Sequence, residues 1–361
     1  MRLVQFGWSG YWQAQWNAEP REEMLAARVT AQQKKLYRLA GEFGECWAEP
    51  AGKMFFEAEG GGELPATGDW VAASYRAEEN RATIHELLPR RTKFSRQAAG
   101  NRTGEQVIAA NVDTVFVVTS LNQDLNARRI ERYLALVWES GARPVVLLTK
   151  SDLCADTAAA QEEVERAAMG VPVHAISAAQ GAGIEAIRAY FGEGQTVALV
   201  GSSGAGKSTL VNYLLGAEVQ RVREIRDGDD RGRHATTARE LFLLPDGGLI
   251  LDTPGIRELQ LWDAGEGLKQ TFADIVELAA QCRFRDCTHS SEPGCAVQAA
   301  LADGSLDAAR WESLQKLERE QQFQLRKMDV NARIAEQKRW KKLHQQVKDL
   351  YELRRREGRE K

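Results

Sequence analysis

The chain has 361 residues, of which 48 are Lys or Arg and 51 are Asp or Glu, and its formal net charge is -3. Its 43% hydrophobic residues are ordinary for a globular protein and exclude a wholly disordered chain, while five cysteines favour a reducing, cytoplasmic location over a disulfide scaffold. No run of about 18 apolar residues is present, so we expect no membrane-spanning helix. At about 150 residues per domain, the length predicts two or three domains.

Residues 1–110 predict a small β-barrel that follows an aromatic segment. Two runs of β-type composition, 69–75 and 82–88, are separated by turn-rich sequence, which is typical of a small all-β barrel or sandwich. Glycines interrupt the N-terminal sequence, so we expect no signal peptide there. Four aromatic residues near the N-terminus fall at helical spacing, and we interpret them as a strap packed on a neighbouring domain. They are Trp8, Tyr11, Trp12 and Trp16.

Residues 111–262 predict an α/β domain. Apolar runs alternate there with amphipathic segments, and the runs are 115–118, 145–148, 173–176, 197–200 and 249–251. Strands that alternate with helices favour a parallel sheet with helices on both faces. Ligands bind at the carboxyl ends of such strands, so the loops that follow these runs are the candidate site.

A phosphate-binding loop follows the fourth run. Residues 201–208, GSSGAGKS, fit the pattern G-x-x-x-x-G-K-[ST] between a predicted strand and a predicted helix. Glycines let backbone N–H groups surround phosphate oxygens, and the helix N-terminus adds positive charge. Lys207 is predicted to reach the β- and γ-phosphates, and Ser208 to bind Mg²⁺. A glycine-rich turn without a ligand is the alternative. The residues assigned to the nucleotide here are Gly201, Ser202, Ser203, Gly204, Ala205, Gly206, Lys207, Ser208 and Thr209.

Two later segments predict switch elements. Asp252-Thr-Pro-Gly255 follows the last run, and Asp252 is predicted to contact Mg²⁺ through water while the Gly255 N–H senses the γ-phosphate. The polar stretch 223–239 contains a threonine that can complete the Mg²⁺ shell, with Thr236 as first choice and Thr237 as second. An inert surface loop is the alternative for this stretch.

Ile256 follows Gly255, at a position where many GTPases have a glutamine that orients water. We therefore expect slow intrinsic hydrolysis, about 10⁻⁴–10⁻³ s⁻¹. His234 is the catalytic candidate that positions water once a partner orders its loop, and Lys207 acts with it on the phosphates. A solvated loop histidine is the alternative for His234.

A guanine reader follows the second run. Thr149-Lys-Ser-Asp152 fits [NT]-K-x-D, and the Asp152 carboxylate can accept hydrogen bonds from guanine N1–H and the 2-amino group, which adenine does not offer. Lys150 can lie along the base, and Ser177-Ala178 can add a backbone N–H to guanine O6. Each motif is weak evidence alone, and a helix start capped by Ser or Asp is an alternative explanation of TKSD. Because all of the motifs follow predicted strands of one domain, together they favour GTP as the ligand.

The order of these motifs is unusual, because the guanine readers precede the phosphate loop. Cutting a common GTPase chain between its second helix and fourth strand, and joining the old ends, yields this order with 191–195 as the new connection. The rearrangement leaves Asp252 near the end of the domain, where nucleotide state can move whatever follows.

A cysteine-rich cluster follows the α/β domain. Its members are Cys282, Cys287, His289 and Cys295. A Cys₃His set suits tetrahedral Zn²⁺ without an open position, so the predicted role is structural, and binding would fold a polar segment that has little core. A redox or disulfide function is the alternative. Cys46 and Cys154 are isolated, and we interpret them as packing residues.

Two basic regions flank the α/β domain. Residues 81–102 carry a net charge of +5, and residues 331–361 carry +6. In a chain of net charge -3 they favour a polyanionic partner, and a small barrel with basic helices suits RNA better than duplex DNA. The alternative for the second region is a helical tail that packs through its apolar seam on the body of the protein.

The motifs TKSD, SA, GSSGAGKS, GRHATT, DTPG and CRFRDCTHSSEPGC, in this order, resemble the circularly permuted bacterial GTPases that mature the small ribosomal subunit, the RsgA/YjeQ family. The resemblance covers nearly the whole chain and implies a multidomain α/β protein. Its parts would be an N-terminal OB-like β-barrel over 1–110, a circularly permuted P-loop GTPase domain over 111–262, and a zinc-binding helical domain with a basic tail over 263–361.

The resemblance also implies a function. Family members hydrolyse GTP to GDP with stimulation by the small (30S) subunit, bind its 16S rRNA near the decoding region, and dissociate after hydrolysis. Thr149 stands where many members have Asn, which predicts a weaker tie between the guanine and phosphate loops. Ala235 stands where many have Thr, which favours Thr236 as the metal ligand.

Two other functions stay open from sequence. One is an RNA-binding scaffold that uses guanine nucleotide only as a structural ligand, and the other is an ATP-dependent kinase or ATPase with the same phosphate loop. We expect a monomer that has no membrane partner.

Overall fold

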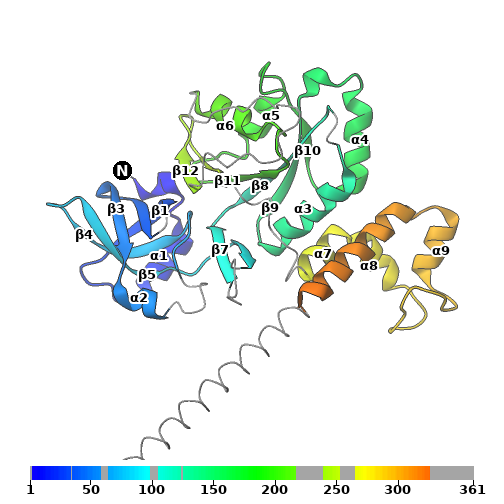
Figure 1. Ribbon diagram of the computed structural model, residues 1–361, viewed down its shortest axis with the longest axis horizontal. Helices are drawn as coiled ribbons and strands as arrows, with labels where there is room; N and C mark the ends of the chain where they lie inside the picture. The colour runs from blue at the N-terminus through cyan, green and yellow to red at the C-terminus, as the bar shows by residue number, and fades with distance from the viewer. Residues whose placement is uncertain are drawn as a thin grey trace, which may run out of the picture.

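The computed structural model describes residues 2–33, 35–57, 64–97, 105–122, 125–216, 239–252 and 265–325. Figure 1 shows a β-barrel, a central α/β region and a group of C-terminal helices in chain order. Within these described ranges, no helix combines the length and the apolar character needed to cross a membrane.

The first region is a closed barrel. Its strands are β1 (Leu25–Gln33), β2 (Leu36–Gly41), β3 (Gly44–Pro50), β4 (Trp70–Arg76) and β5 (Arg81–Leu87). Alternate side chains point inward, so that Leu39, Cys46 and Ile84 share one core. β1 pairs with β2 and β4, β3 pairs in parallel with β5, and the helix α2 (Gly52–Glu57) connects β3 to β4. The predicted OB-like barrel is therefore confirmed.

The aromatic N-terminal segment packs against the barrel. It forms the short helix η1 (Leu3–Phe6) and the helix α1 (Gly10–Asn17). Trp12 is buried, and the rings of Trp8 and Trp70 meet edge to face with centroids 4.8 Å apart. The interpretation of this segment as a packed strap is confirmed.

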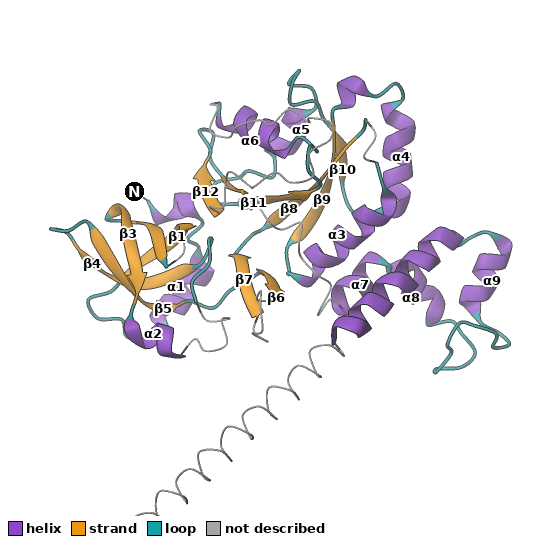
Figure 2. Ribbon diagram, viewed as in Figure 1, coloured by secondary structure: helices purple, strands orange, loops and turns teal. Residues whose placement is uncertain are grey.

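The central region is one sheet, preceded by a separate hairpin of β6 (Lys93–Gln97) and β7 (Glu105–Ala110) (Figure 2). The strands of the sheet are β8 (Thr114–Ser120), β9 (Arg143–Thr149), β10 (Val173–Ala175), β11 (Thr196–Gly201), β12 (Arg239–Leu243) and β13 (Leu249–Asp252). They lie in the order β10-β9-β8-β11-β13-β12, and only β12 is antiparallel to its neighbour β13. The strand that leads to the phosphate loop, β11, thus lies inside the sheet, between β8 and β13.

Helices cover both faces of this sheet because successive strand side chains point to opposite sides. The covering helices are α3 (Ala127–Glu139), α4 (Thr157–Ala167), α5 (Ile184–Arg188) and α6 (Lys207–Leu215). In β8, Val115 and Val117 join the core under α3 and α4, whereas Phe116 and Val118 join the core under α5 and α6. The two-sided cover predicted from the apolar runs is confirmed.

The barrel and the central sheet are continuous. β1 pairs antiparallel with β12, with Ala31 opposite Glu240, and Glu240 in turn stands opposite Asp252 of β13. Ala31 also stands opposite Arg38 of β2, and an ion pair joins Arg38 to Glu240 across β1. No sequence pattern pointed to this junction between the two regions.

A buried arginine joins the N-terminal segment, the barrel and the central sheet. Arg28 is 2% exposed, and its guanidinium donates to the carbonyl oxygens of Gly68 (2.7 Å), Phe6 (2.5 Å) and Asn111 (2.9 Å) and to the hydroxyl of Thr196 (3.2 Å). Burial lowers the pKa of Arg28 to about 10, so the group is still charged at neutral pH.

The C-terminal region docks on α3 through a second buried arginine. Its helices are α7 (Gly265–Thr271), α8 (Ala273–Ala279), α9 (Ala296–Asp303) and a helix over 308–325. The Arg310 guanidinium donates hydrogen bonds to the buried carboxylate of Glu131 on α3, to the carboxylate of Asp274 and to the carbonyl oxygen of Thr271. Its guanidinium also lies over the ring of Phe272 at 4.8 Å. The basic region predicted at 331–361 lies outside the described residues.

We expect Arg28→Met to lower the free energy of unfolding by about 3–5 kcal/mol, because four buried acceptors lose their charged donor. Urea denaturation followed by circular dichroism measures the effect. Arg188→Met is the control, since it removes only surface ion pairs, with Asp246 and Glu185, and should cost less than about 1 kcal/mol. Equal losses in the two variants would contradict the role of Arg28.

Candidate functional site

The predicted nucleotide-binding loops meet at one edge of the sheet. β8, β9, β10, β11 and β13 are parallel, so their carboxyl ends share that edge. Three predicted residues, His234, Thr236 and Gly255, lie outside the described residues. Asp252 is described only as the last residue of β13. The geometry below therefore concerns the phosphate loop and the guanine readers.

The phosphate loop runs from the end of β11 to the start of α6. A β-carbon on Gly201 would lie 2.1 Å from the carbonyl oxygen of Val118, so only glycine fits there. Gly206 caps α6 at φ +88, and Lys207 Nζ donates to the carbonyl oxygens of Gly201 (2.9 Å) and Ser202 (2.5 Å). Ser203, Gly204 and Ala205 complete the loop, and Ser208 and Thr209 lie in the first turn of α6. An ammonium group and a helix N-terminus at one loop make a phosphate-binding arrangement.

Thr149 joins the guanine loop to the phosphate loop. It is the last residue of β9 and is 3% exposed. Its hydroxyl donates to the carbonyl oxygen of Ala205 at 2.6 Å and lies 3.3 Å from the carbonyl oxygen of Thr119. The hydroxyl has a single proton, which favours the shorter contact, to Ala205. Thr149 thus links the two loops by a hydrogen bond, although we expected a weaker link from threonine than from the asparagine of many family members.

Lys150 bends the chain into the guanine loop. It has a left-handed backbone, φ 58 and ψ 39, which costs a residue with a side chain about 1–2 kcal/mol. The Ser151 N–H donates to the carbonyl oxygen of Ile176 at 3.2 Å and holds this bend. The bend leads into the short helix η2 (Ser151–Leu153), where Asp152 is exposed at the sheet edge. Backbone strain of this kind is concentrated at functional sites.

The two N–H groups of the predicted second guanine reader, Ser177-Ala178, differ in their hydrogen bonding. The Ser177 N–H donates to the carbonyl oxygen of Ala182 at 2.9 Å, and the Ser177 hydroxyl accepts from the Gln180 N–H at 3.2 Å. The Ala178 N–H has no acceptor within the part of the chain that the structure describes. Of the two predicted residues, Ala178 therefore carries the donor that is open to a base.

Tyr213 on α6 contacts the loop that carries this donor, although the sequence did not single it out. A β-carbon on Gly181 would lie 2.7 Å from the Tyr213 hydroxyl oxygen, so the phenol rests against the glycine. The helix that follows the phosphate loop thus supports the loop that follows β10. No pattern could reveal this contact, because a tyrosine on a helix surface has many ordinary roles.

We expect Thr149→Val to weaken GTP binding about tenfold, since the Ala205 carbonyl oxygen loses its donor and about 1.4 kcal/mol of stabilisation. Titration with a fluorescent GTP analogue measures the change. Thr149→Ser keeps the hydroxyl and is the matched control, with affinity close to that of the wild type. If valine binds GTP as tightly as serine does, the hydrogen bond does not organise the site.

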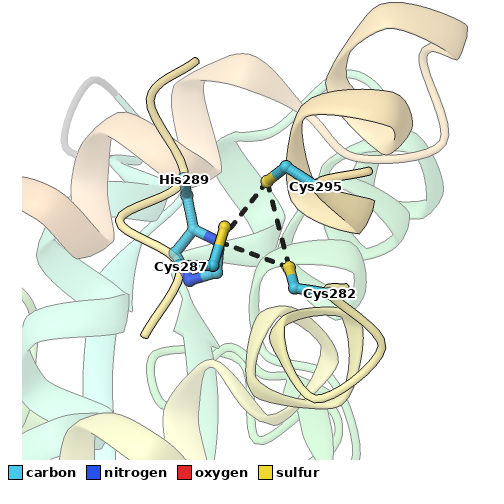
Figure 3. Close-up of side chains that lie close together, drawn as sticks. All are labelled: Cys282, Cys287, His289 and Cys295. Carbon is cyan, nitrogen blue, oxygen red and sulfur yellow. Dashed lines mark hydrogen bonds between the residues drawn. The ribbon is translucent and has the colours of Figure 1, made fainter. Parts of the chain in front are cut away.

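The predicted metal ligands come together in the C-terminal region (Figure 3). The ligand atoms of Cys282, Cys287, His289 and Cys295 all lie within 4.8 Å of one another. The Cys282 and Cys295 sulfurs are 3.9 Å apart, and each lies 3.5 Å from His289 Nδ1. A tetrahedral Zn²⁺ with ordinary bond lengths separates two sulfurs by about 3.8 Å and a sulfur from a nitrogen by about 3.5 Å. The donor set and its spacing fit a closed zinc site.

Polar contacts hold the loop that carries His289. This residue has a left-handed backbone at φ 58, and its carbonyl oxygen accepts from the Gln298 side chain at 2.7 Å. The Glu292 carboxylate accepts from the N–H groups of Thr288 (2.9 Å) and Ser290 (3.0 Å) and from the Thr288 hydroxyl. The Thr288 hydroxyl and these backbone donors hold the pKa of Glu292 at about 2, so it stays ionised at neutral pH. The histidine is thus positioned by the loop itself.

We expect the purified protein to contain one zinc ion per chain, and Cys282→Ser to lose most of it because the remaining ligands cannot close the site. Elemental analysis after dialysis measures the content. Cys154→Ser removes a free cysteine outside the cluster and should retain the ion. Full zinc content in Cys282→Ser would show that the cluster is not the site.

The first basic region is partly structural. Arg90 makes two hydrogen bonds, of 2.8 and 2.7 Å, to the buried carboxylate of Asp69. Arg91 lies over the ring of Tyr11, with its guanidinium 5.6 Å from the ring centroid. The side chains of Arg96 and Arg102 lie outside the described residues. The charge counted along the sequence therefore overstates the charge that this region offers to a partner.

Comparison with known proteins places these features in a family. A family model described as RsgA GTPase matches residues 87–262, and one described as 50S ribosome-binding GTPase matches residues 196–357. The chain is 48% identical over 354 residues to the small ribosomal subunit biogenesis GTPase RsgA of Opitutus terrae, which covers 96% of each chain. It is 48% identical over 287 residues to the protein of that name from Methanosarcina acetivorans, which covers 80% of this chain and 78% of that one.

Two solved structures have the same fold. YjeQ from Thermotoga maritima is 24% identical with a TM-score of 0.61, and the match covers 82% of this chain and 98% of that one. YloQ, described as a circularly permuted GTPase, is 23% identical with a TM-score of 0.58, and the match covers 84% and 96%. The permuted order of the motifs is thus matched by the fold.

Proposed function

Because the chain belongs to the RsgA family of small ribosomal subunit biogenesis GTPases, we propose that it binds GTP, hydrolyses it to GDP and phosphate on the small (30S) subunit, and then dissociates. The observation that supports this proposal is the hydrogen bond from Thr149 to Ala205, which joins the predicted guanine reader to the phosphate loop. Such a site accommodates a guanine at one end and a triphosphate at the other.

Each part of the site has a proposed task. Asp152 accepts from guanine N1–H and the 2-amino group, and the Ala178 N–H donates to O6. Lys207 and the N–H groups of its loop bind the β- and γ-phosphates. A Mg²⁺ ion held by Ser208 and Thr236 neutralises charge on these phosphates when it is bound. His234 positions the attacking water. The position after Gly255, where a glutamine would do so, is occupied by isoleucine.

The flanking regions are proposed to bind the subunit. The barrel and the C-terminal region, which we divide from the GTPase domain at 110/111 and 262/263, contact 16S rRNA. One structural zinc ion holds the C-terminal loop in shape. The geometry of the cysteine and histidine ligands supports this assignment. We propose that the protein acts as a monomer in the cytoplasm.

GTP turnover with and without purified small subunits tests this function. We expect slow intrinsic turnover and strong stimulation by subunits, and we expect His234→Ala to lower the stimulated rate by about 100-fold or more. His85→Ala, which changes a barrel histidine exposed to solvent, is the matched control and should be stimulated as the wild type is. Phosphate release measured by a coupled assay gives both rates.

Two outcomes would favour other functions. Absence of stimulation by subunits would indicate a scaffold that uses guanine nucleotide as a structural ligand. Preference for ATP in a competition titration, or an unchanged nucleotide preference in Asp152→Ala, would indicate an ATP-dependent enzyme.

A further inference from the structure

The outer face of the barrel carries an exposed tryptophan between two arginines. Trp47 of β3 is 39% exposed, because its neighbours Cys46 and Ala48 point into the barrel core. In the strand register, Trp47 stands opposite Arg38 of β2 on one side and Arg81 of β5 on the other. Residues opposite one another on adjacent strands share a face, so these three side chains form a row across the sheet.

Neither arginine of this row is fully used by the protein. Arg81 lies 4.0 Å from Glu49, and both side chains are exposed, so this ion pair contributes little. Arg38 pairs with Glu240, but its side chain is still 30% exposed. Another anion can therefore reach both guanidinium groups, although it cannot reach the buried Nε–H of Arg38.

The acidic residues near Trp47 lie in a different direction. Glu45 and Glu49 are two residues before and after Trp47 on β3, so they share its face along the strand. The two arginines thus flank Trp47 across the strands, with Glu240 beyond Arg38, whereas negative charge flanks Trp47 along β3. A polyanion that reaches Trp47 is attracted along the row of arginines and repelled along the strand.

We propose that this row, Arg38–Trp47–Arg81, binds single-stranded RNA. An unpaired base stacks on Trp47, and the flanking phosphates bind the two arginines, so that the RNA backbone crosses the strands. Strands 2 and 3 of an OB barrel form the face on which this fold binds oligonucleotides, and aromatic stacking between cations accepts any base. The inference rests on the proposed function and names the part of the barrel that contacts unpaired rRNA.

RNA binding at this row has a consequence for the GTPase site. A phosphate at Arg38 competes with Glu240, which belongs to β12 and stands opposite Asp252 in the next strand. RNA binding therefore weakens the ion pair that joins the barrel to β12. Removing the carboxylate in Glu240→Gln frees Arg38 and is expected to tighten RNA binding.

Fluorescence anisotropy of the full chain with a labelled uridine decamer tests the proposal. Trp47→Ala should weaken decamer binding about 5- to 150-fold, which is the effect of losing one stacked base. Trp47→Phe, which keeps an aromatic face, should lose less, Arg81→Gln should also weaken binding, and Glu240→Gln should tighten it. A blunt RNA duplex of equal length should bind the wild type and both Trp47 variants alike, because its bases are not accessible for stacking.

Phe56→Ala is the matched control, since Phe56 is 81% exposed but lies on α2, outside the row. Decamer affinity in Trp47→Ala equal to that of the wild type, or an equal loss in Phe56→Ala, would overturn the proposal. GTP turnover without subunits should match the wild type in Trp47→Ala and reports correct folding. If subunits fail to stimulate the wild type, the proposed function fails; if they do and Trp47→Ala binds the decamer normally, only this inference fails.

Discussion

The buried guanidinium of Arg28 fixes the position of the barrel against the GTPase domain. Removing an ion from water is costly, and here the cost is offset by four oxygen acceptors that come from separate parts of the chain. Only a planar group with five donors can serve all of them, so lysine is no substitute. One of these acceptors is the hydroxyl of Thr196, the first residue of β11. Arg310 likewise fixes the C-terminal region against the GTPase domain, because its guanidinium donates to Glu131 of α3. Both flanking regions are thus fixed to the GTPase domain by buried arginines.

The second connection of the barrel lies three residues further along β1, at Ala31, and has a different character. β12 pairs with β13 of the GTPase domain and with β1 of the barrel, and it begins at Arg239. The segment that carries His234 and Thr236 ends directly before this residue. Any change in that segment that shifts β12 must be accommodated by the β1–β12 pairs, because hydrogen-bonded strands keep their register. The barrel is therefore attached to the GTPase domain at Arg28 and through β12, the strand that follows the predicted switch segment in the chain.

Much of this organisation follows from short-range sequence signals. Apolar runs with helices between them predicted the sheet, and the phosphate loop, TKSD and the cysteine cluster predicted which loops carry chemistry, because each of these patterns depends on neighbouring residues. The features that sequence missed join distant segments: the four bonds of Arg28, the pairing of Ala31 with Glu240, and the contact of Tyr213 with Gly181. Arg90 shows the converse error, since a cation counted toward a surface patch is bound to a buried carboxylate. Charge along a sequence does not reveal which partners the fold supplies.

The permuted order gives the two flanking regions unequal access to the nucleotide. In the sheet, β8 and β13 lie on either side of β11, so the chain enters and leaves the domain next to the strand that bears the phosphate loop. These strands are parallel to β11, so β8 is entered at its amino end, away from the nucleotide, whereas β13 ends with Asp252 at the nucleotide edge. The C-terminal region therefore follows in the chain from the carboxyl end of β13, at the edge that carries the phosphate loop. Among the described residues, the barrel reaches that side across strands, through Glu240 and the ladder that contains Asp252 and through a hydrogen bond from the Thr67 hydroxyl to the carbonyl oxygen of Arg239. An unpermuted chain enters the domain through the phosphate-loop strand itself, so its entry and exit strands would not lie on either side of that strand.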